Sequence, residues 1–324
     1  MTSFVNELAL QDFSVNEKAP KKKKASKLLK KERRVAFLFI LPPLISFTVF
    51  TIIPMIVALI LAVGHFNILT YEYDFVGFDN FAELFDLSRP NGREFVKSIT
   101  NTIVFIIEVP IAIGLGLLCA SLANSKGCRK SNSIFRVLLY LPTVCSAVAA
   151  GIIWRVIFTY DANPNATGVI NSIFDNTVDW FHDRVSLHIA IIAKNSINGM
   201  GSAMILYYAS MCNISKEYYE AAEMDGANGL RQFCHITFPM LTPVTFYLLI
   251  MRMAGCLQSY SDSIIFAPNN SDSRTIVYFI WQYGIKSTTH NVSLASAAAI
   301  VLGVAIMFIT IVQFKLSNKW VLDL

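Results

Sequence analysis

Glu220-Ala221-Ala222-Glu223-Met224-Asp225-Gly226-Ala227 is the stretch that says most about the fold of this chain. It lies in a polar segment over 212–239 between two long apolar runs, so this helix-forming segment is expected to lie in water beside a membrane. Ala221 and Ala222 are small enough to let another surface approach the backbone closely. Gly226 stands where a helix would stop. Taken alone, the stretch is also compatible with an ordinary solvated turn between two helices.

The composition places the chain among integral membrane proteins. Of its 324 residues, 54% are hydrophobic and 15% are charged, and the mean hydropathy is +0.51. The formal net charge of +5 comes from Lys and Arg residues that cluster at predicted membrane edges, so no nucleic-acid partner is expected. The six cysteines have neither CxxC nor His-paired spacing, so the sequence predicts no metal site and no cofactor.

Six apolar stretches are long enough to cross a bilayer core, which takes about 20 residues. They lie at 35–63, 99–123, 134–158, 187–211, 240–261 and 294–316. The predicted fold class is therefore an all-α membrane protein with six transmembrane helices in a domain over 35–324. Prolines inside the spans, Pro142 among them, predict kinks rather than breaks. The polar tail over 1–34 is basic and is predicted to be a cytoplasmic segment drawn to anionic membrane lipid.

The distribution of Lys and Arg predicts the orientation in the membrane. With the N-terminus inside, 18 of the 27 basic residues fall in the inside segments and 7 in the outside loops, while Lys194 and Arg252 lie within spans. Both termini and the 212–239 segment are therefore predicted to be cytoplasmic.

A series of short motifs accompanies the Glu220–Ala227 stretch along the chain. In order they are Leu41-Pro42 with Pro54, Val76-Gly77-Phe78-Asp79-Asn80-Phe81, Ser98 with Asn101-Thr102, Phe135-Arg136, Leu141-Pro142, Gly151-Ile152-Ile153-Trp154, Ser296-Ala297, and Gln313 with Lys319-Trp320. Together with the 212–239 segment, which is similar to the EAA loop, the series resembles the permease subunit of carbohydrate ATP-binding-cassette importers of the maltose and multiple-sugar type. The resemblance implies a type I importer permease fold in the bacterial cell membrane. It also implies three partners: a second, different permease subunit, a dimer of ATPases and an extracellular sugar-binding protein.

The resemblance assigns a role to the 212–239 segment, which would dock onto the ATPase and couple it to transport. Six residues carry this assignment: Glu220, Ala221, Ala222, Asp225, Gly226 and Pro239. Ser215 is expected to cap the start of the docking helix. The sequence contains no GxxxxGK[ST], HExxH or GxSxG motif. The chain is therefore predicted not to be an enzyme, and ATP hydrolysis is expected in the partner ATPase.

Polar and charged residues inside the predicted spans are the candidates for a substrate path. Glu108, Lys194 and Arg252 are expected to face protein or a water-filled cavity, because a central Lys or Arg costs about 2.5–3.5 kcal/mol in hydrocarbon. A structural ion pair of Glu108 with Lys194 or Arg252 is the alternative. The predicted path comprises five residues: Asn195, Arg252, Gln258, Ser259 and Tyr260. Gln258 is favoured as the sugar contact because an amide both donates and accepts hydrogen bonds, whereas Arg252 only donates.

Three functions remain open from the sequence. The first is import of a sugar or oligosaccharide delivered by the extracellular binding protein. The second is import of glycerol phosphate or another polyol phosphate, which would favour several basic residues along the path. The third, from a different class, is a self-contained secondary transporter coupled to an ion through Glu108, which the EAA-like segment argues against.

Overall fold

The computed structural model describes residues 27–68, 70–124, 132–160, 168–174, 178–268, 270–286 and 291–321. Most of the predicted basic tail over 1–34, and the middle of the predicted inside segment over 124–136, lie outside the described residues. The chain divides into two compact units, residues 1–56 and 57–324, and each is described by itself.

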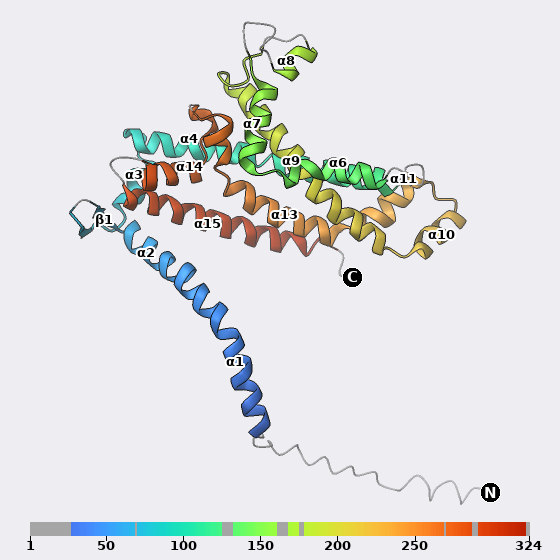
Figure 1. The fold of residues 1–324 in the computed structure, drawn as a ribbon, viewed down its shortest axis with the longest axis horizontal. Coiled ribbons are helices and arrows are strands. Elements are labelled where there is room, and N and C mark those ends of the chain that lie inside the picture. Colours follow the sequence, from blue (N-terminus) through green and yellow to red (C-terminus); the bar gives the residue numbers. More distant parts are fainter. Residues whose placement is uncertain are drawn as a thin grey trace, which may run out of the picture. The chain divides into compact units, whose positions relative to one another are not determined.

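The described part of the first unit is a helix interrupted by one wider turn (Figure 1). Its elements are α1 (Lys27–Phe47), the π-helical turn η1 (Thr48–Ile52) and the start of α2 (Ile53–Ala62), which continues into the second unit. In the wide turn the Ile53 N–H donates to the carbonyl of Thr48, directly before Pro54, which has no N–H to continue the ladder.

The second unit opens with a hairpin and a short helix, which the predicted 76–81 motif holds in place. The elements are strands β1 (Gly64–Asn67) and β2 (Glu72–Phe75), which pair antiparallel, and helix α3 (Asp79–Phe85). Gly77 adopts φ +64°, a left-handed conformation that favours glycine, and turns the chain after β2. The Asn80 amide donates to the carbonyls of Ala62 (2.9 Å) and Gly64 (2.8 Å). The motif therefore fixes the chain at the point where α2 ends.

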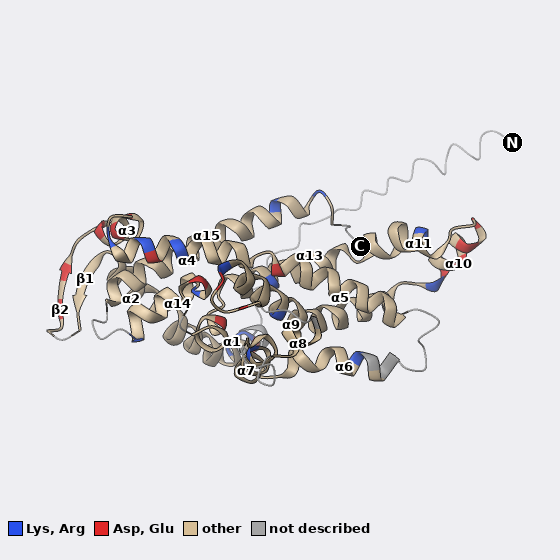
Figure 2. Ribbon diagram, turned by 90° about the horizontal axis from the view of Figure 1, so that it is seen from above, with Lys and Arg blue, Asp and Glu red and all other residues tan. Residues whose placement is uncertain are grey.

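The rest of the second unit, where it is described, is helical. In order, the elements are α4 (Pro90–Phe105), α5 (Glu108–Asn124), α6 (Asn132–Val144), α7 (Ala147–Phe158), α8 (Val169–Phe174), α9 (Arg184–Asn213), α10 (Lys216–Met224), α11 (Gly229–Gln232), η3 (Phe233–Thr237), α12 (Phe238–Met240), α13 (Thr242–Leu257), η4 (Asp262–Phe266), η5 (Ser271–Ser273), α14 (Ile276–Trp281), η6 (Gln282–Lys286) and α15 (Val292–Ser317). The elements η3, η4 and η6 are π-helical turns, and η5 is a 3-10 turn. In Figures 1 and 2, α10 lies at one end of this unit and the hairpin with α3 lies at the other.

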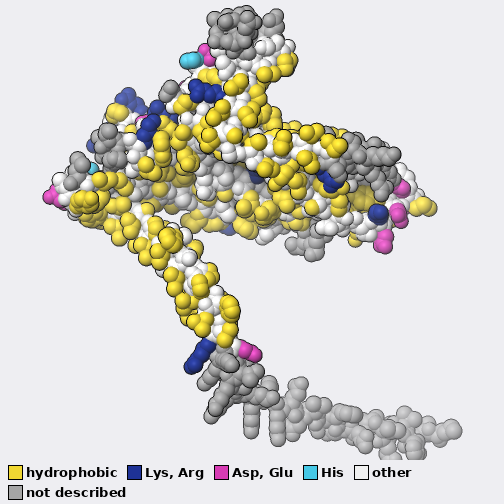
Figure 3. All heavy atoms as spheres, in the orientation of Figure 1, with side chains coloured by type: hydrophobic (Ala, Val, Ile, Leu, Met, Phe, Trp, Pro, Cys, Tyr) yellow, Lys and Arg dark blue, Asp and Glu magenta, His cyan; other side chains and the backbone are white. Residues whose placement is uncertain are grey.

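Within the described ranges, four helical stretches are long and apolar enough to cross a membrane: Glu32–Ala62, Pro90–Asn124, Arg184–Asn213 and Val292–Ser317. Two bent pairs raise the number to six if each pair forms one span: Arg136–Val144 with Ala147–Phe158, and Gly229–Met240 with Thr242–Leu257. These stretches correspond in position to the six predicted ones. Apolar side chains cover much of the surface visible in Figure 3, and charged side chains show at the α10 end and near α3 and α4.

The third predicted span differs from the expected single kinked helix. Helices α6 and α7 meet at an angle of 106°, with the break at Cys145 and Ser146. Pro142 removes a backbone N–H near the end of α6. The Ser146 hydroxyl then accepts from the Ala149 N–H (3.2 Å) and starts a new helix. The prediction of a kink at this proline is therefore wrong, because a helix cap follows within four residues.

Helix α9 lies at the centre of the larger core of the second unit. Its Leu187, Met204 and Tyr207 are fully buried, in a cluster with side chains of α5, α13 and η4. Helix α5 approaches closely, since a Cβ added to Gly116 would lie 2.5 Å from that of Ala203. A second core joins α4, α14 and α15 and includes Phe95, Phe279 and Leu294. Helix α9 can therefore position polar groups against two neighbouring helices.

Candidate functional site

A cavity of about 420 Å³ lies between α5, α9 and α13. Its lining combines apolar surface with a few hydrogen-bonding groups, as is typical of sites for small ligands. The polar lining residues include Glu108 on α5, Asn195, Asn198 and Ser202 on α9, Arg252 on α13, and Ser259 just beyond α13.

Arg252 reaches from α13 onto the surface of α9. Its Nη2 donates to the Ser202 hydroxyl (3.1 Å). The guanidinium lies directly over Gly199, because a Cβ added there would lie only 2.0 Å from Nη1 and 2.3 Å from Cζ. Gly199 therefore provides the space that Arg252 occupies. Gly199 and Ser202 were not among the predicted residues, because a glycine inside an apolar helix carries no local signal of such a contact.

Glu108 is the first residue of α5 and is 8% exposed. Its Oε2 atom is buried and has no hydrogen-bond partner in the part of the chain that the structure describes. The side chains of Asn195 and Cys256 are within hydrogen-bonding reach of the same carboxyl group. Neither of the partners considered from the sequence, Lys194 or Arg252, forms an ion pair with it among the described residues.

Lys194 instead forms a buried ion pair with Asp262 of η4. The two side chains are only 5% and 6% exposed. Asn195 completes the arrangement, since its Nδ2 donates to the second Asp262 oxygen (2.7 Å) and its Oδ1 accepts from Lys194 (3.1 Å). These contacts hold α9 to η4 beside the cavity. Asp262 was not predicted as a polar partner, because it lies one residue beyond the predicted fifth span.

The structure brings three of the five predicted path residues, Asn195, Arg252 and Ser259, to the cavity. Gln258 and Tyr260 do not belong to its lining. Gln258 ends α13, its N–H donates to the carbonyl of Ala254 in the last helical turn, and its side chain is exposed. Tyr260 is 45% exposed. Because the helix ends here, neighbouring side chains no longer follow helical spacing, and only Ser259 reaches the cavity.

The predicted docking helix is α10, and none of its residues is buried. The Ser215 hydroxyl accepts from the Glu217 N–H (3.4 Å), which confirms the predicted cap. Glu220 and Ala221 are exposed, and Ala222 is half-buried. Figure 2 shows acidic residues along the ribbon at this end of the second unit. Helix α10 therefore presents both charge and small side chains to its surroundings.

Helix α10 ends at the predicted glycine. Gly226 has φ +75°, and its N–H donates to the carbonyl of Glu223 (3.0 Å). The following N–H, of Ala227, donates to the carbonyl of Ala222 (2.9 Å), so the two bonds form a Schellman motif. Asp225 precedes the glycine and is exposed. The prediction that the helix stops at this glycine is confirmed.

Two contacts tie the α10 segment to the chain that leads into α13. The Tyr219 hydroxyl lies 2.9 Å from Thr237 Oγ1, and Gln232 Nε2 donates to the carbonyl of Ala227 (3.3 Å). Pro239 lies in the first turn of α12, directly before α13. Helix α10 is thus connected to α9 through the chain and to the start of α13 through side chains.

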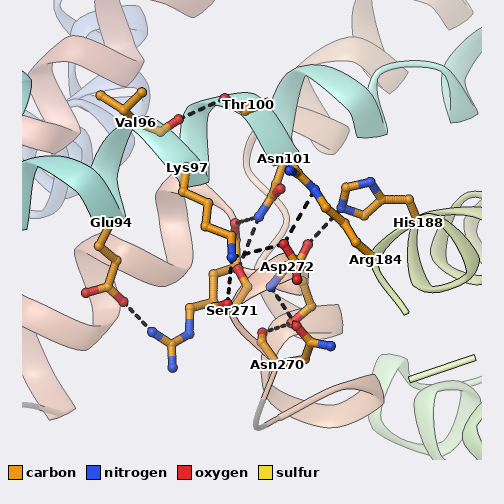
Figure 4. Close-up of polar contacts among 12 residues, drawn as sticks. Glu94, Val96, Lys97, Thr100, Asn101, Arg184, His188, Asn270, Ser271 and Asp272 are labelled. Atoms are coloured by element: carbon orange, nitrogen blue, oxygen red, sulfur yellow. Dashed lines mark hydrogen bonds and ion pairs between the residues drawn. The ribbon is translucent and has the colours of Figure 1, made fainter. Parts of the chain in front are cut away.

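A polar cluster lies at the opposite end of α9, where that helix begins (Figure 4). The Asp272 carboxylate pairs with Lys97 of α4 (3.0 Å) and Arg184 of α9 (3.4 Å). Its backbone carbonyl accepts from His188 Nε2 (2.9 Å). These contacts join α4, α9 and η5.

The cluster continues along α4 to Glu94. This carboxylate pairs with Arg274 and accepts from the Tyr283 hydroxyl (3.0 Å). Burial, and then the charge of Glu94, raise the pKa of the Tyr283 hydroxyl above its ordinary value. Tyr283 therefore remains a neutral donor at neutral pH.

Comparison with known proteins gives matches to most of the chain. Residues 112–322 match the family described as binding-protein-dependent transport system inner membrane component. The probable ABC transporter permease protein YesP of Bacillus subtilis (strain 168) is 31% identical over 307 residues, covering 92% of this chain and 95% of YesP. The arabinooligosaccharides transport system permease protein AraP of the same organism is 30% identical over 293 residues, covering 89% and 90%.

A solved structure shows the same fold. A chain of a bacterial ABC transporter involved in the import of the acidic polysaccharide alginate superposes with a TM-score of 0.76 at 22% identity, covering 90% of this chain and 98% of that chain. The family match extends over well more than half of the sequence, and YesP aligns nearly end to end. The chain therefore belongs to the family of inner membrane components of binding-protein-dependent transport systems.

Proposed function

We propose that this membrane permease is the subunit of an ATP-driven importer that carries a sugar or oligosaccharide delivered by an extracellular binding protein. Membership of the binding-protein-dependent family supports the delivery step. The name of AraP, an arabinooligosaccharide permease, supports a saccharide as the cargo.

The observation that carries the proposal is the cavity between α9 and α13. Sugars present many hydroxyl groups, each of which donates one hydrogen bond and accepts others. Asn195, Ser202, Arg252 and Ser259 supply donors and acceptors to such a ligand within one cavity. Two of the three helices that line it, α9 and α13, are the ones that the α10 segment joins.

The ATPase contact belongs at α10 in this proposal. Glu220 and Asp225 offer charges, Ala221 and Ala222 allow close approach, and Gly226 keeps the helix short. A displacement of α10 acts on α9 through the chain, and on α13 through the Tyr219 contact and the segment around Pro239. Two ATPase subunits that close around nucleotide would thereby tilt α9 and α13 relative to the rest of the cavity, giving alternating access. The function also requires a second permease subunit beside this one.

The proposed topology has six spans, both termini in the cytoplasm and the basic tail over 1–34 on the same side. The asymmetry of Lys and Arg supports this orientation. The placement of α10 and of the hairpin at opposite ends of the second unit is consistent with it (Figure 1).

A phosphate ester is a weaker candidate for the cargo. Of the two basic residues inside the predicted spans, Lys194 is already paired with Asp262. Arg252 is left as one cation in a cavity that also contains Glu108. A phosphate group favours several cationic partners, which the described lining does not supply.

Reconstitution tests the proposal directly. Proteoliposomes that contain this chain, its partner permease and the ATPase should take up a labelled neutral oligosaccharide only when ATP and the binding protein are present. Liposomes with this chain alone should take up none. Uptake by this chain alone, without ATP, would refute the proposed function and favour a secondary transporter.

A further inference from the structure

Glu108 is a buried acid whose hydrogen-bonding capacity is not used up by the protein. It is 8% exposed, it lines the cavity, and its Oε2 has no partner among the described residues. Leaving a buried acceptor unsatisfied in this way is costly, by about 1–3 kcal/mol. A ligand that donates to this oxygen would recover that cost.

Arg252 provides the complementary group in the same cavity. Its one hydrogen bond to a described side chain is the bond from Nη2 to Ser202 (3.1 Å), and a guanidinium has five N–H donors. Contact with the backbone of Gly199 fixes its position. The cavity therefore contains a carboxylate that accepts and a guanidinium that donates.

The cavity combines an acid and a base. Lys194 and Asp262 neutralise each other beside it, so they contribute no net charge. Glu108 and Arg252 both line the cavity, and no ion pair joins these two side chains. The site therefore presents strong hydrogen-bonding groups of both kinds.

We propose that Glu108 is a substrate-binding residue and that, together with Arg252, it selects an uncharged polyhydroxylated ligand over an anionic one. One hydroxyl of a neutral glycan donates to Glu108, and another oxygen of the glycan accepts from Arg252. The carboxylate of a uronate would be attracted by Arg252 but repelled by Glu108 in a site of low dielectric constant. This inference rests on the proposed function and names the class of saccharide that the site accepts.

The test measures binding to the assembled transporter in nanodiscs without its binding protein, so that the selectivity of the binding protein does not enter. Saturation-transfer difference NMR detects weak ligands, and the probes are maltotriose and arabinotriose, which are neutral, and trigalacturonate, which is anionic. The wild type should bind at least one neutral probe and not trigalacturonate. Glu108→Gln should weaken neutral binding by about 10-fold or more, the loss of a hydrogen bond to a charged group. It should also gain trigalacturonate binding, because Arg252 is then left without an opposing charge.

The matched control is Glu72→Gln, which neutralises an exposed carboxylate on strand β2 and should leave all binding unchanged. Binding of trigalacturonate to the wild type as strongly as a neutral probe, no binding of either neutral probe, or unchanged neutral binding in Glu108→Gln would each overturn the proposal. A separate uptake assay with the binding protein present distinguishes the two levels of inference. If the wild type takes up sugar and any of these results is also found, only the proposed role of Glu108 is refuted. If the wild type takes up no sugar, the proposed function itself is refuted.

Discussion

Replacing Gly199 by alanine perturbs the cavity without replacing any of its polar side chains. The added Cβ would lie 2.0 Å from Nη1 and 2.2 Å from Nη2 of Arg252, and ordinary van der Waals contact begins at 3.4 Å. The backbone of α9 is held by the core around Leu187, Met204 and Tyr207. The flexible end of Arg252 must therefore move, and it leaves its position beside Ser202.

Two contributions to the stability of the protein oppose each other in this variant. Alanine stabilises a helix interior by roughly 0.5–1 kcal/mol relative to glycine. The lost bond between Arg252 and Ser202 costs about 0.6–1.7 kcal/mol, the range for hydrogen bonds between transmembrane helices. The free energy of unfolding should therefore change by no more than about 1.2 kcal/mol. Transport should fall about 10-fold, because the ligand loses a hydrogen bond from a charged donor.

The assay compares sugar uptake by the reconstituted complex with its thermal unfolding temperature. Gly303→Ala in α15 is the matched control, since a Cβ there meets nothing within 4 Å. If the effect acts through Arg252, then Gly199→Ala should have no further effect in an Arg252→Gln background. Normal sugar uptake by Gly199→Ala would refute the reasoning. So would a double variant whose loss of uptake equals the sum of the losses in Gly199→Ala and Arg252→Gln.

Three further outcomes are expected. Gly226→Ala places a side chain at φ +75° and should lower sugar uptake per ATP hydrolysed while membrane insertion stays normal; unchanged coupling in this variant and in Glu220→Ala would exclude α10 as the docking element. Lys194→Met leaves Asp262 buried without its cation and should destabilise the chain by about 3–5 kcal/mol, measured as a lower yield and unfolding temperature, and an unchanged unfolding temperature would contradict this. In a variant free of native cysteines, a single cysteine at Tyr71, which is 80% exposed, should react with an impermeant thiol reagent in intact cells, and protection there would contradict the proposed topology.

The features that could be predicted from sequence are those with local causes. The Ser215 cap and the stop at Gly226 depend on residues within a few positions, so the ends of α10 were predictable and are found. The positions of the spans follow from apolar runs. The break between α6 and α7 was predicted as a kink, because Pro142 alone gives no information on whether a new cap follows; Ser146 supplies that cap.

The site depends on contacts between residues far apart in the chain, which local patterns do not encode. Arg252 and Ser202 are 50 positions apart, and Lys194 and Asp262 are 68 apart. The sequence showed that Lys194 and Arg252 needed polar surroundings, because an intramembrane charge is costly. The sequence did not show which acidic residue would pair with Lys194 or Arg252. Glu108 was therefore considered a partner for Lys194, which Asp262 neutralises in the structure.

The arrangement of these four charges indicates which pair is structural. Lys194 and Asp262 have the features of a purely structural contact between α9 and η4. They are paired and nearly inaccessible, and Asn195 forms a hydrogen bond with each of them. Glu108 is buried and Arg252 is half-buried, but the two do not form an ion pair and both line the same cavity. Holding an acid and a base in a membrane protein without pairing them with each other lowers its stability, since each loses hydration and gains no opposite charge in contact. A ligand with hydroxyl groups would satisfy both groups, and for this reason we assign the unpaired set, and not the paired one, to the proposed transport site.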